Sequence, residues 1–153
     1  MSVELKNEEE AKKFFEKTVK VCSPKGLVLN HNQRKTVMKI LKEAAEKAGR
    51  KFIEMDLSVI QEEKIGTTIF EDEVPGWLKN AFENEKGGYV VYLREFHFAS
   101  DRVKNDAMNL MIDKGVGDKK FPPDTFVVLG VMDVDDMPSA LSNVHTAKFY
   151  RTR

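Results

Sequence analysis

The sequence predicts a single α/β domain in which helices cover both faces of a mostly parallel sheet. Segments with apolar residues at helical spacing alternate along the chain with short strand-like segments. The strand-like segments are apolar throughout rather than at every second position, which is typical of parallel strands that are buried on both faces. The length of 153 residues is that of one ordinary domain.

The first half of the chain supplies two expected helices and two expected strands. Apolar residues recur at helical spacing from Glu8 onward, and Pro24 ends that helix because proline disfavours helix in the residue before it. We therefore expect residues 1–24 to form an N-terminal helix that packs on a core of residues 25–153. Within the core we expect a strand over 26–30, a helix over 33–48 that Gly49 terminates, and a strand over 51–57.

The second half continues the alternation. The segment 89–93 is apolar throughout and is predicted to be the third strand, and Ser100 or Asp101 can cap the helix that follows it. The other expected elements are a loop over 58–74, a short helix over 75–83, a polar turn over 115–123, a strand over 125–131, a short helix over 138–141 and a last strand over 147–150.

Composition and charge exclude several classes of protein. Lys+Arg and Asp+Glu both number 25, and this zero net charge argues against a dedicated nucleic-acid binder, which usually carries a basic surplus. The single cysteine, Cys22, cannot form an intramolecular disulfide. No apolar run approaches the roughly 18 residues that cross a bilayer, and the first residues lack the apolar stretch of a signal peptide. We therefore expect a cytoplasmic protein that contacts neither membrane nor nucleic acid.

The connection between the first core strand and the next helix has the position of a phosphate-binding loop. In the motif G-x-x-x-x-G-K-[ST], the glycines let backbone N–H groups approach phosphate, the lysine reaches the terminal phosphates and the hydroxyl holds Mg²⁺. The aligned residues 29–36 read LNHNQRKT, so Lys35 and Thr36 are present whereas Leu29 and Arg34 replace the glycines. Lys35 and Thr36 are the candidate nucleotide-binding residues; the other interpretation is a vestigial loop with a solvated lysine and an ordinary first-turn threonine.

The later segments resemble the AAA+ ATPases, most closely their MoxR-like and dynein-related branch. That branch has an apolar strand ending in Asp-Glu, a helix with spaced Ala, Val and Asn, then a Gly and a Pro-Pro pair before the next strand. The corresponding segments here are 90–95, 99–111, Gly117 with Pro122 and Pro123, 125–129, and 135–141, which matches the family's D-x-L-x-x-A-L. The resemblance covers roughly residues 25 to 150 in order and spacing.

This resemblance implies a three-layer α/β/α fold of the P-loop NTPase type, with five strands in the order 5-1-4-3-2. In the family a helical lid follows the fifth strand, whereas this sequence stops at Arg153. We therefore expect only the α/β core subdomain, without the lid, and a monomer or small oligomer rather than a ring.

The resemblance also assigns roles to residues at two strand ends. Glu95 corresponds to the catalytic base, and Arg94 stands where the family has the Asp that holds Mg²⁺ through water. A guanidinium has no acceptor atom and stays protonated, so it cannot be a metal ligand. Met132 aligns with the Asn that positions the attacking water, and Asp133 follows it. Asp133 or another strand-end acid could pair with Arg94 and fill the former metal position; the alternatives are an unpaired, exposed Arg94 and an ordinary strand-end carboxylate at Glu95.

We therefore predict a catalytically degenerate AAA+-like domain, a pseudoenzyme that acts as a binding or scaffold module for another protein. Phosphoryl transfer needs several parts in position together, and several are altered here. We expect no cofactor and no metal, because the three histidines are scattered and have no further ligands at suitable spacing. The alternative is a residual nucleotide-binding protein or weak ATPase that uses Lys35, Thr36 and Glu95 with ATP and Mg²⁺, completed by another subunit.

Overall fold

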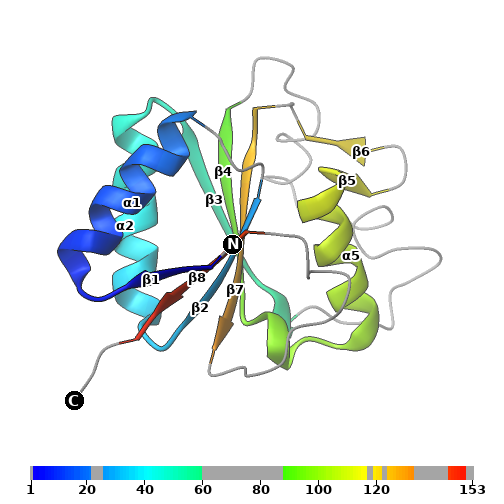
Figure 1. Ribbon diagram of the computed structural model, residues 1–153. Coiled ribbons are helices and arrows are strands. Elements are labelled where there is room, and N and C mark those ends of the chain that lie inside the picture. Colours follow the sequence, from blue (N-terminus) through cyan, green and yellow to red (C-terminus); the bar gives the residue numbers. More distant parts are fainter. Residues whose placement is uncertain are drawn as a thin grey trace.

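A parallel sheet lies between two layers of helices in the computed structural model, which describes residues 2–21, 26–59, 88–116, 119–121, 124–132 and 145–150 (Figure 1). Its strand order is β1-β8-β2-β7-β4-β3, and every neighbouring pair is parallel. Helices α1 and α2 cover one face and α5 covers the other. The strands are β1 (Ser2–Leu5), β2 (Gly26–His31), β3 (Lys51–Asp56), β4 (Tyr89–Arg94), β7 (Phe126–Met132) and β8 (His145–Phe149); the helices are α1 (Glu8–Val21), α2 (Arg34–Lys47) and α5 (Asp101–Ile112).

Helix α1 begins at a capping arrangement that the sequence encodes locally. The Asn7 side chain accepts a hydrogen bond from the Glu10 N–H, and the Glu10 carboxylate accepts one from the Lys6 N–H. Three glutamates in its first turn suit the positive end of the helix dipole. Its apolar stripe, which includes Phe15, is buried, and α1 packs against α2.

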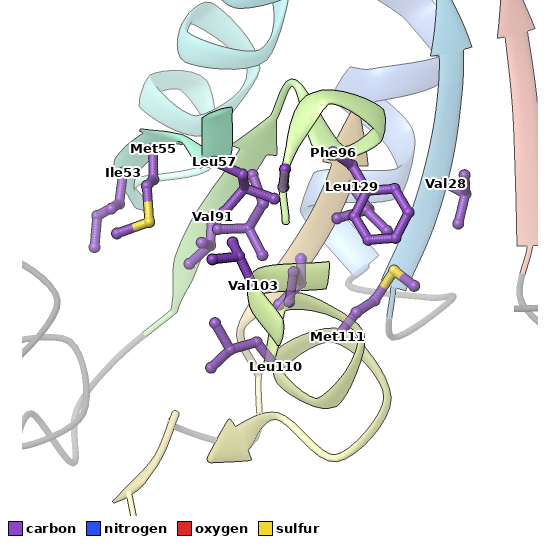
Figure 2. Packing of buried hydrophobic residues seen from close by; sticks show 14 of the residues in the cluster. Val28, Ile53, Met55, Leu57, Val91, Phe96, Val103, Leu110, Met111 and Leu129 are labelled. Carbon is purple, nitrogen blue, oxygen red and sulfur yellow. The ribbon is translucent and has the colours of Figure 1, made fainter. Parts of the chain in front are cut away.

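The two faces of the sheet carry separate hydrophobic clusters. On the α5 side, Val103 and Leu110 of the helix pack against Val91 and Leu129 of the strands (Figure 2). On the opposite side, α1 and α2 cover residues that include Leu29 and Val128. The near-continuous apolarity of β2, β4 and β7 follows from this burial on both faces.

The predicted fold class is confirmed, and the five expected strands have the expected order. Two predicted helix boundaries are also confirmed. Ser100 caps α5 by accepting a hydrogen bond from the Val103 N–H, and Gly49 follows α2 with a φ of 71°.

The structure differs from the sequence-based prediction at several elements. Strand β1 adds a sixth strand at the sheet edge, next to β8. The expected strand over 51–57 ends at Asp56, where the 3₁₀ turn η1 (Leu57–Val59) begins. The last strand begins at His145 rather than at residue 147. The expected turn over 115–123 contains two short antiparallel strands, β5 (Gly115–Val116) and β6 (Lys119–Lys120).

Some expected elements lie outside the described residues. These are most of the loop over 58–74, the helices over 75–83 and 138–141, and Asp133. Within the described part of the chain, no helix is long and apolar enough to span a membrane.

Candidate functional site

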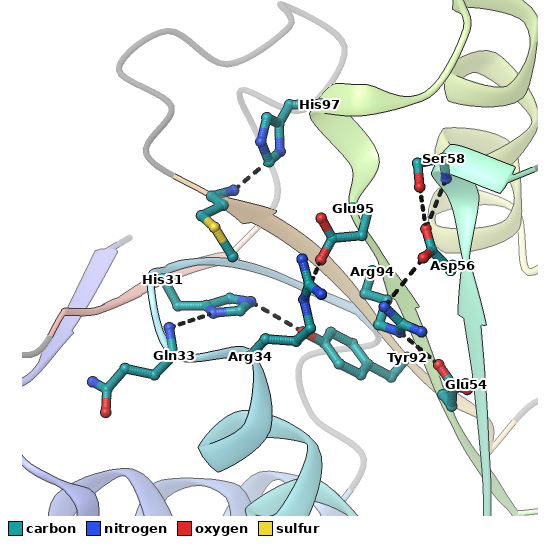
Figure 3. Close-up of polar contacts among 11 residues, drawn as sticks. His31, Gln33, Arg34, Glu54, Asp56, Ser58, Tyr92, Arg94, Glu95 and His97 are labelled. Carbon is teal, nitrogen blue, oxygen red and sulfur yellow. Dashed lines mark hydrogen bonds and ion pairs between the residues drawn. The ribbon is translucent and has the colours of Figure 1, made fainter.

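Polar and charged side chains gather where strands β2, β3 and β4 end at the carboxyl edge of the sheet (Figure 3). This is the edge at which open α/β sheets generally bind their ligands. We call the group the carboxyl-edge cluster; its members are His31, Arg34, Glu54, Asp56, Tyr92, Arg94 and Glu95.

The connection between β2 and α2 is only two residues long. Strand β2 runs through His31 and α2 begins at Arg34, so the octet 29–36 divides between strand and helix. Both N–H groups of the connection donate within the protein: Asn32 to the Phe149 carbonyl at 3.4 Å and Gln33 to Nδ1 of His31 at 3.2 Å. A phosphate-cradling loop instead turns successive backbone N–H groups toward its ligand.

Lys35 and Thr36 lie in the first turn of α2, where the motif alignment places them. Lys35 is exposed and Thr36 is half-buried. Their assignment to nucleotide binding stays a prediction, because it rests on their position alone.

Glu95 forms an ion pair with Arg34. The Arg34 Nε lies 2.8 Å from Oε1 of Glu95, whose side chain is 6% exposed while that of Arg34 is 51% exposed. The backbone of Glu95 has a φ of 64°, in the left-handed region that a non-glycine residue adopts only at a cost. The candidate base Glu95 is therefore held by Arg34, the residue that replaces the second loop glycine. The pairing was not predicted from the sequence, although an arginine in place of that glycine was the available signal.

Arg94 pairs with two acids of the neighbouring strand β3. Its Nε lies 2.7 Å from Oε2 of Glu54, and its Nη1 lies 3.2 Å from Oδ2 of Asp56. Asp56 and Arg94 are directly opposite in the parallel register. Arg94 is therefore neither unpaired nor fully exposed, and its described partners come from β3, whereas the expected partner Asp133 lies outside the described residues.

Asp56 is also bonded to Ser58. Its Oδ1 accepts hydrogen bonds from the Ser58 N–H at 3.0 Å and the Ser58 hydroxyl at 2.5 Å. Burial alone would raise the pKa of Asp56, but these hydrogen bonds and the positive charges of Arg94 and Arg34 outweigh it and lower the pKa. The Asp56 carboxylate is thus kept ionised beside the guanidinium.

His31 and Tyr92 meet across the intervening strand β7. Nε2 of His31 lies 3.0 Å from the Tyr92 hydroxyl. Strand β7 separates β2 from β4, and it carries Gly130 where the tyrosine ring crosses. A Cβ at Gly130 would lie 2.8 Å from the Tyr92 ring and 3.0 Å from its hydroxyl, so a side chain at this position would collide with the tyrosine.

Both ring side chains are neutral near pH 7. Burial, and secondarily the charges of Arg34 and His97, lower the pKa of His31 to about 4. Burial also raises the pKa of Tyr92. Sequence patterns do not reveal this pair, because His31 and Tyr92 are 61 positions apart and come together only through the order of the strands in the sheet.

The structure brings two of the three histidines to this edge. His97 lies in the 3₁₀ turn η3 (Phe96–Phe98) that follows β4, and its Nδ1 accepts a hydrogen bond from the Met132 N–H at 3.2 Å. His31 lies close enough for His97 to affect its pKa. His145 instead begins β8. Among the residues that the structure describes, no three His, Cys, Asp or Glu side chains are placed to hold a metal ion.

No protein-family model matches the chain, and no curated protein matches its sequence. Its fold is similar to that of the P216G mutant of RuvB from Thermotoga maritima, an AAA+ P-loop ATPase, with a TM-score of 0.60 at 12% identity over 93% of this chain and 46% of that one. It is also similar to RIF2 from Saccharomyces cerevisiae, with a TM-score of 0.58 at 12% identity over 93% of this chain and 54% of that one.

These likenesses show the fold and nothing finer. The chain has an α/β fold similar to that of the P-loop NTPases and spans about half the length of each of these two structures. The expected MoxR-like and dynein-related branch stays a prediction, because structures at 12% identity show the fold alone.

Proposed function

We propose that this chain is an AAA+-like domain that does not hydrolyse ATP and that serves as a binding module for another protein. The observation that carries the proposal is the ion pair between Arg34 and Glu95. A general base must reach the proton that it abstracts. Glu95 is buried, and its carboxylate is bonded to a cation of its own chain.

The position that the family uses for Mg²⁺ supports the same proposal. It holds the guanidinium of Arg94, whose charge is already matched by Glu54 and Asp56. A guanidinium repels a divalent cation and offers it no lone pair. The donor set at this strand end therefore does not fit Mg²⁺.

The β2–α2 connection supports it as well. Its two N–H groups are bonded to Phe149 and His31, so neither is directed at a ligand. The His31–Tyr92 pair is buried beside this connection. The residues here do not fit a triphosphate in the way a glycine-rich loop does.

Two exposed apolar side chains support the binding role. Val59 of η1 is 72% exposed and Phe98 of η3 is 63% exposed, and the two turns contact each other at the carboxyl edge. The backbone beneath Phe98 is held firmly, because Phe96 is buried and His97 is bonded to Met132. Exposed aromatic residues on rigid backbone are typical anchors of protein interfaces.

Thermal melting with millimolar Mg-ATP tests whether the folded chain binds nucleotide. A ligand at 100 times its Kd that binds only the folded chain stabilises it by about 2.7 kcal/mol, which moves the Tm by several degrees. We expect no shift for the wild-type chain and no phosphate release. A shift that Lys35→Ala abolishes would contradict the proposal.

That contrary result would establish the second candidate function, nucleotide binding through Lys35 and Thr36. One observation favours it: Lys35 is exposed in the first turn of α2, where helix N–H groups favour anions. A shift that persists in Lys35→Ala would place the ligand elsewhere and would exclude nucleotide binding through Lys35.

The binding role is tested with Phe98→Ser and a matched control. Ile112→Ser removes another exposed apolar side chain, at the far end of α5. In chemical cross-linking of the chain within cell extract, we expect Phe98→Ser to reduce the yield of the cross-linked partner about tenfold and Ile112→Ser to leave it unchanged. Equal yields for wild type and Phe98→Ser would exclude this edge as the binding surface.

A further inference from the structure

The imidazole of His31 is buried, and both of its nitrogens are engaged. Nδ1 accepts the Gln33 N–H at 3.2 Å, and Nε2 lies 3.0 Å from the Tyr92 hydroxyl. A backbone N–H is only a donor, so Nδ1 must carry a lone pair there. The structure therefore requires the neutral tautomer with its proton on Nε2, which donates to Tyr92.

The hydrogen bond to Gln33 holds the start of α2. Gln33 is the residue that precedes the helix, and its own side chain makes no capping bond. The next residue, Arg34, reaches Glu95 at 2.8 Å, and the Glu95 carbonyl accepts the Phe98 N–H at 3.1 Å. A continuous set of contacts thus runs from His31 through the start of α2 to Glu95 (Figure 3), and from the Glu95 carbonyl to the turn that presents Phe98.

We propose that His31 is a proton-sensitive latch that keeps this edge closed only while its imidazole is neutral. A second proton on Nδ1 would face the Gln33 N–H donor, so that hydrogen bond would break. The first turn of α2 would then move, and Arg34 would separate from Glu95. The result is an acid-induced local opening of the carboxyl edge.

Burial and the two positive neighbours that act on His31 disfavour its charged imidazole. Arg34 approaches from α2 and His97 from η3, and both oppose a positive charge. On the β4 side it faces the neutral Tyr92, and beyond this lie Arg94 and Glu95, whose charges Tyr92 senses. Its register partners, Met132 of β7 and Phe149 of β8, are uncharged.

The direction of the pH effect follows from the two protonation equilibria. In the closed fold, burial and the neighbouring cations hold the pKa of His31 near 4, against 6.5 when the side chain is free. The opened form therefore binds the proton more tightly, and opening becomes favourable as the pH falls from about 6.5 toward about 4. Linkage predicts an opened population about 30-fold larger at pH 5 than at pH 8.

This latch goes beyond the proposed function and does not rest on it. It requires only the contacts of His31, and it would exist whether or not the edge binds a protein or a nucleotide. A failure of the latch experiment would therefore leave the melting and cross-linking tests unaffected.

Amide hydrogen exchange of the full chain, followed by NMR, tests the latch. After correction for intrinsic exchange rates, we expect the protection factor of the Gln33 amide to fall about 30-fold between pH 8 and pH 5. His31→Asn is the matched control, because its side-chain oxygen can still accept the Gln33 N–H but does not titrate. In that variant we expect a fall of less than about threefold; an equal fall in wild type and His31→Asn overturns the proposal.

A second comparison separates His31 from His97, whose Nδ1 also accepts a backbone N–H. The 30-fold fall should persist in His97→Asn, and its loss there would assign the response to His97 and overturn the latch. Should His31→Asn not fold, the imidazole ¹⁵N shifts of the wild type replace it. They should show an unprotonated Nδ1 at pH 8 that titrates together with the Gln33 amide; a protonated Nδ1 at pH 8 contradicts the proposal.

Discussion

The carboxyl-edge cluster and the outer face of α1 and α2 both contain ion pairs of the same length. Lys47 lies 2.7 Å from Glu16 on the outer face, and Arg94 lies 2.7 Å from Glu54 at the carboxyl edge. Their surroundings differ, because the Lys47 side chain is 60% exposed while that of Arg94 is 19% exposed. The distances are therefore equal, the two glutamates are similarly exposed at 34% and 38%, and the burial of the cation is what separates the two pairs.

This difference decides what each pair does for the protein. Water and salt screen an exposed pair, so breaking it changes stability little. Removing one member of a partly buried pair leaves a charge that water satisfies only in part, which costs more than breaking an exposed pair. The carboxyl-edge pairs accordingly hold the strand ends and α2 together, whereas the pairs on the outer face are dispensable.

The largest effect should come from acid, through His31. A pKa near 4 in the fold against 6.5 unfolded makes the folded chain the weaker proton binder, so its stability is complete above about pH 6.5 and falls toward pH 4. We expect His31 alone to lower the free energy of unfolding by about 3 kcal/mol from pH 7 to pH 4. Urea denaturation at a series of pH values gives the free energy of unfolding. The measurement is the difference between wild type and His31→Asn in the slope of that free energy against pH.

His145→Asn serves as the control for that comparison, since His145 is exposed at the start of β8. It should leave the pH dependence of the wild type unchanged. If His31→Asn and wild type lost stability in parallel between pH 7 and pH 4, the buried neutral imidazole would not be the cause of the loss of stability in acid.

The next largest effect should follow Arg94→Ala, which leaves Glu54 and Asp56 without their shared cation. We expect a loss of about 2 to 3 kcal/mol in the free energy of unfolding, below the value for a fully buried pair because both acids retain some contact with water. Arg94→Lys should recover part of the loss, since it keeps the charge but not the two-pronged geometry. Chemical denaturation at pH 7 is the measurement; an unchanged midpoint for Arg94→Ala would remove the distinction between the two regions.

Gly130→Ala should cost about 1 to 3 kcal/mol, because its new methyl group would collide with the Tyr92 ring that reaches His31. In a Tyr92→Val background the same substitution should cost less, and a double-mutant cycle measures the difference. Gly49→Ala is the comparison variant: a Cβ there meets nothing within 4 Å, so only its φ of 71° opposes the change. Additive effects at Gly130 and Tyr92 would show that the two positions do not interact.

The smallest effect should follow Lys47→Ala on the outer face. Its pair with Glu16 is exposed, so we expect a denaturation midpoint indistinguishable from wild type at physiological salt. The decisive comparison is with Arg94→Ala in the same buffer. A loss as large as that of Arg94→Ala would mean that burial does not separate the two regions.

The sequence predicted the elements whose cause is local. The buried strands, the Ser100 cap of α5 and the Gly49 end of α2 each depend on residues within a few positions of one another. Strand β1 escaped prediction because four residues carry little periodic signal. Its place in the sheet depends on pairing with β8, which lies about 140 positions later in the sequence.

The candidate site was predicted in position but not in arrangement. The expected strand over 26–30 left the connection to begin at His31, yet His31 extends β2 because it pairs with both β7 and β8. The sequence named Asp133 or another strand-end acid as the partner of Arg94 without indicating which strand supplies it, and the described partners Glu54 and Asp56 come from β3. Such contacts depend on strand register, which local sequence patterns do not contain.

The central claim is that ion pairs within the chain close the carboxyl edge. The most direct test is to add millimolar Mg-ATP to the isotope-labelled chain and to map the changes in its amide chemical shifts by NMR. The described geometry predicts unchanged resonances for Gln33, Lys35 and Glu95, because the Gln33 N–H, the Arg34 side chain and the Glu95 carboxylate are engaged internally. Saturable shifts at these amides, lost in Lys35→Ala, would show instead that the edge opens to receive a nucleotide.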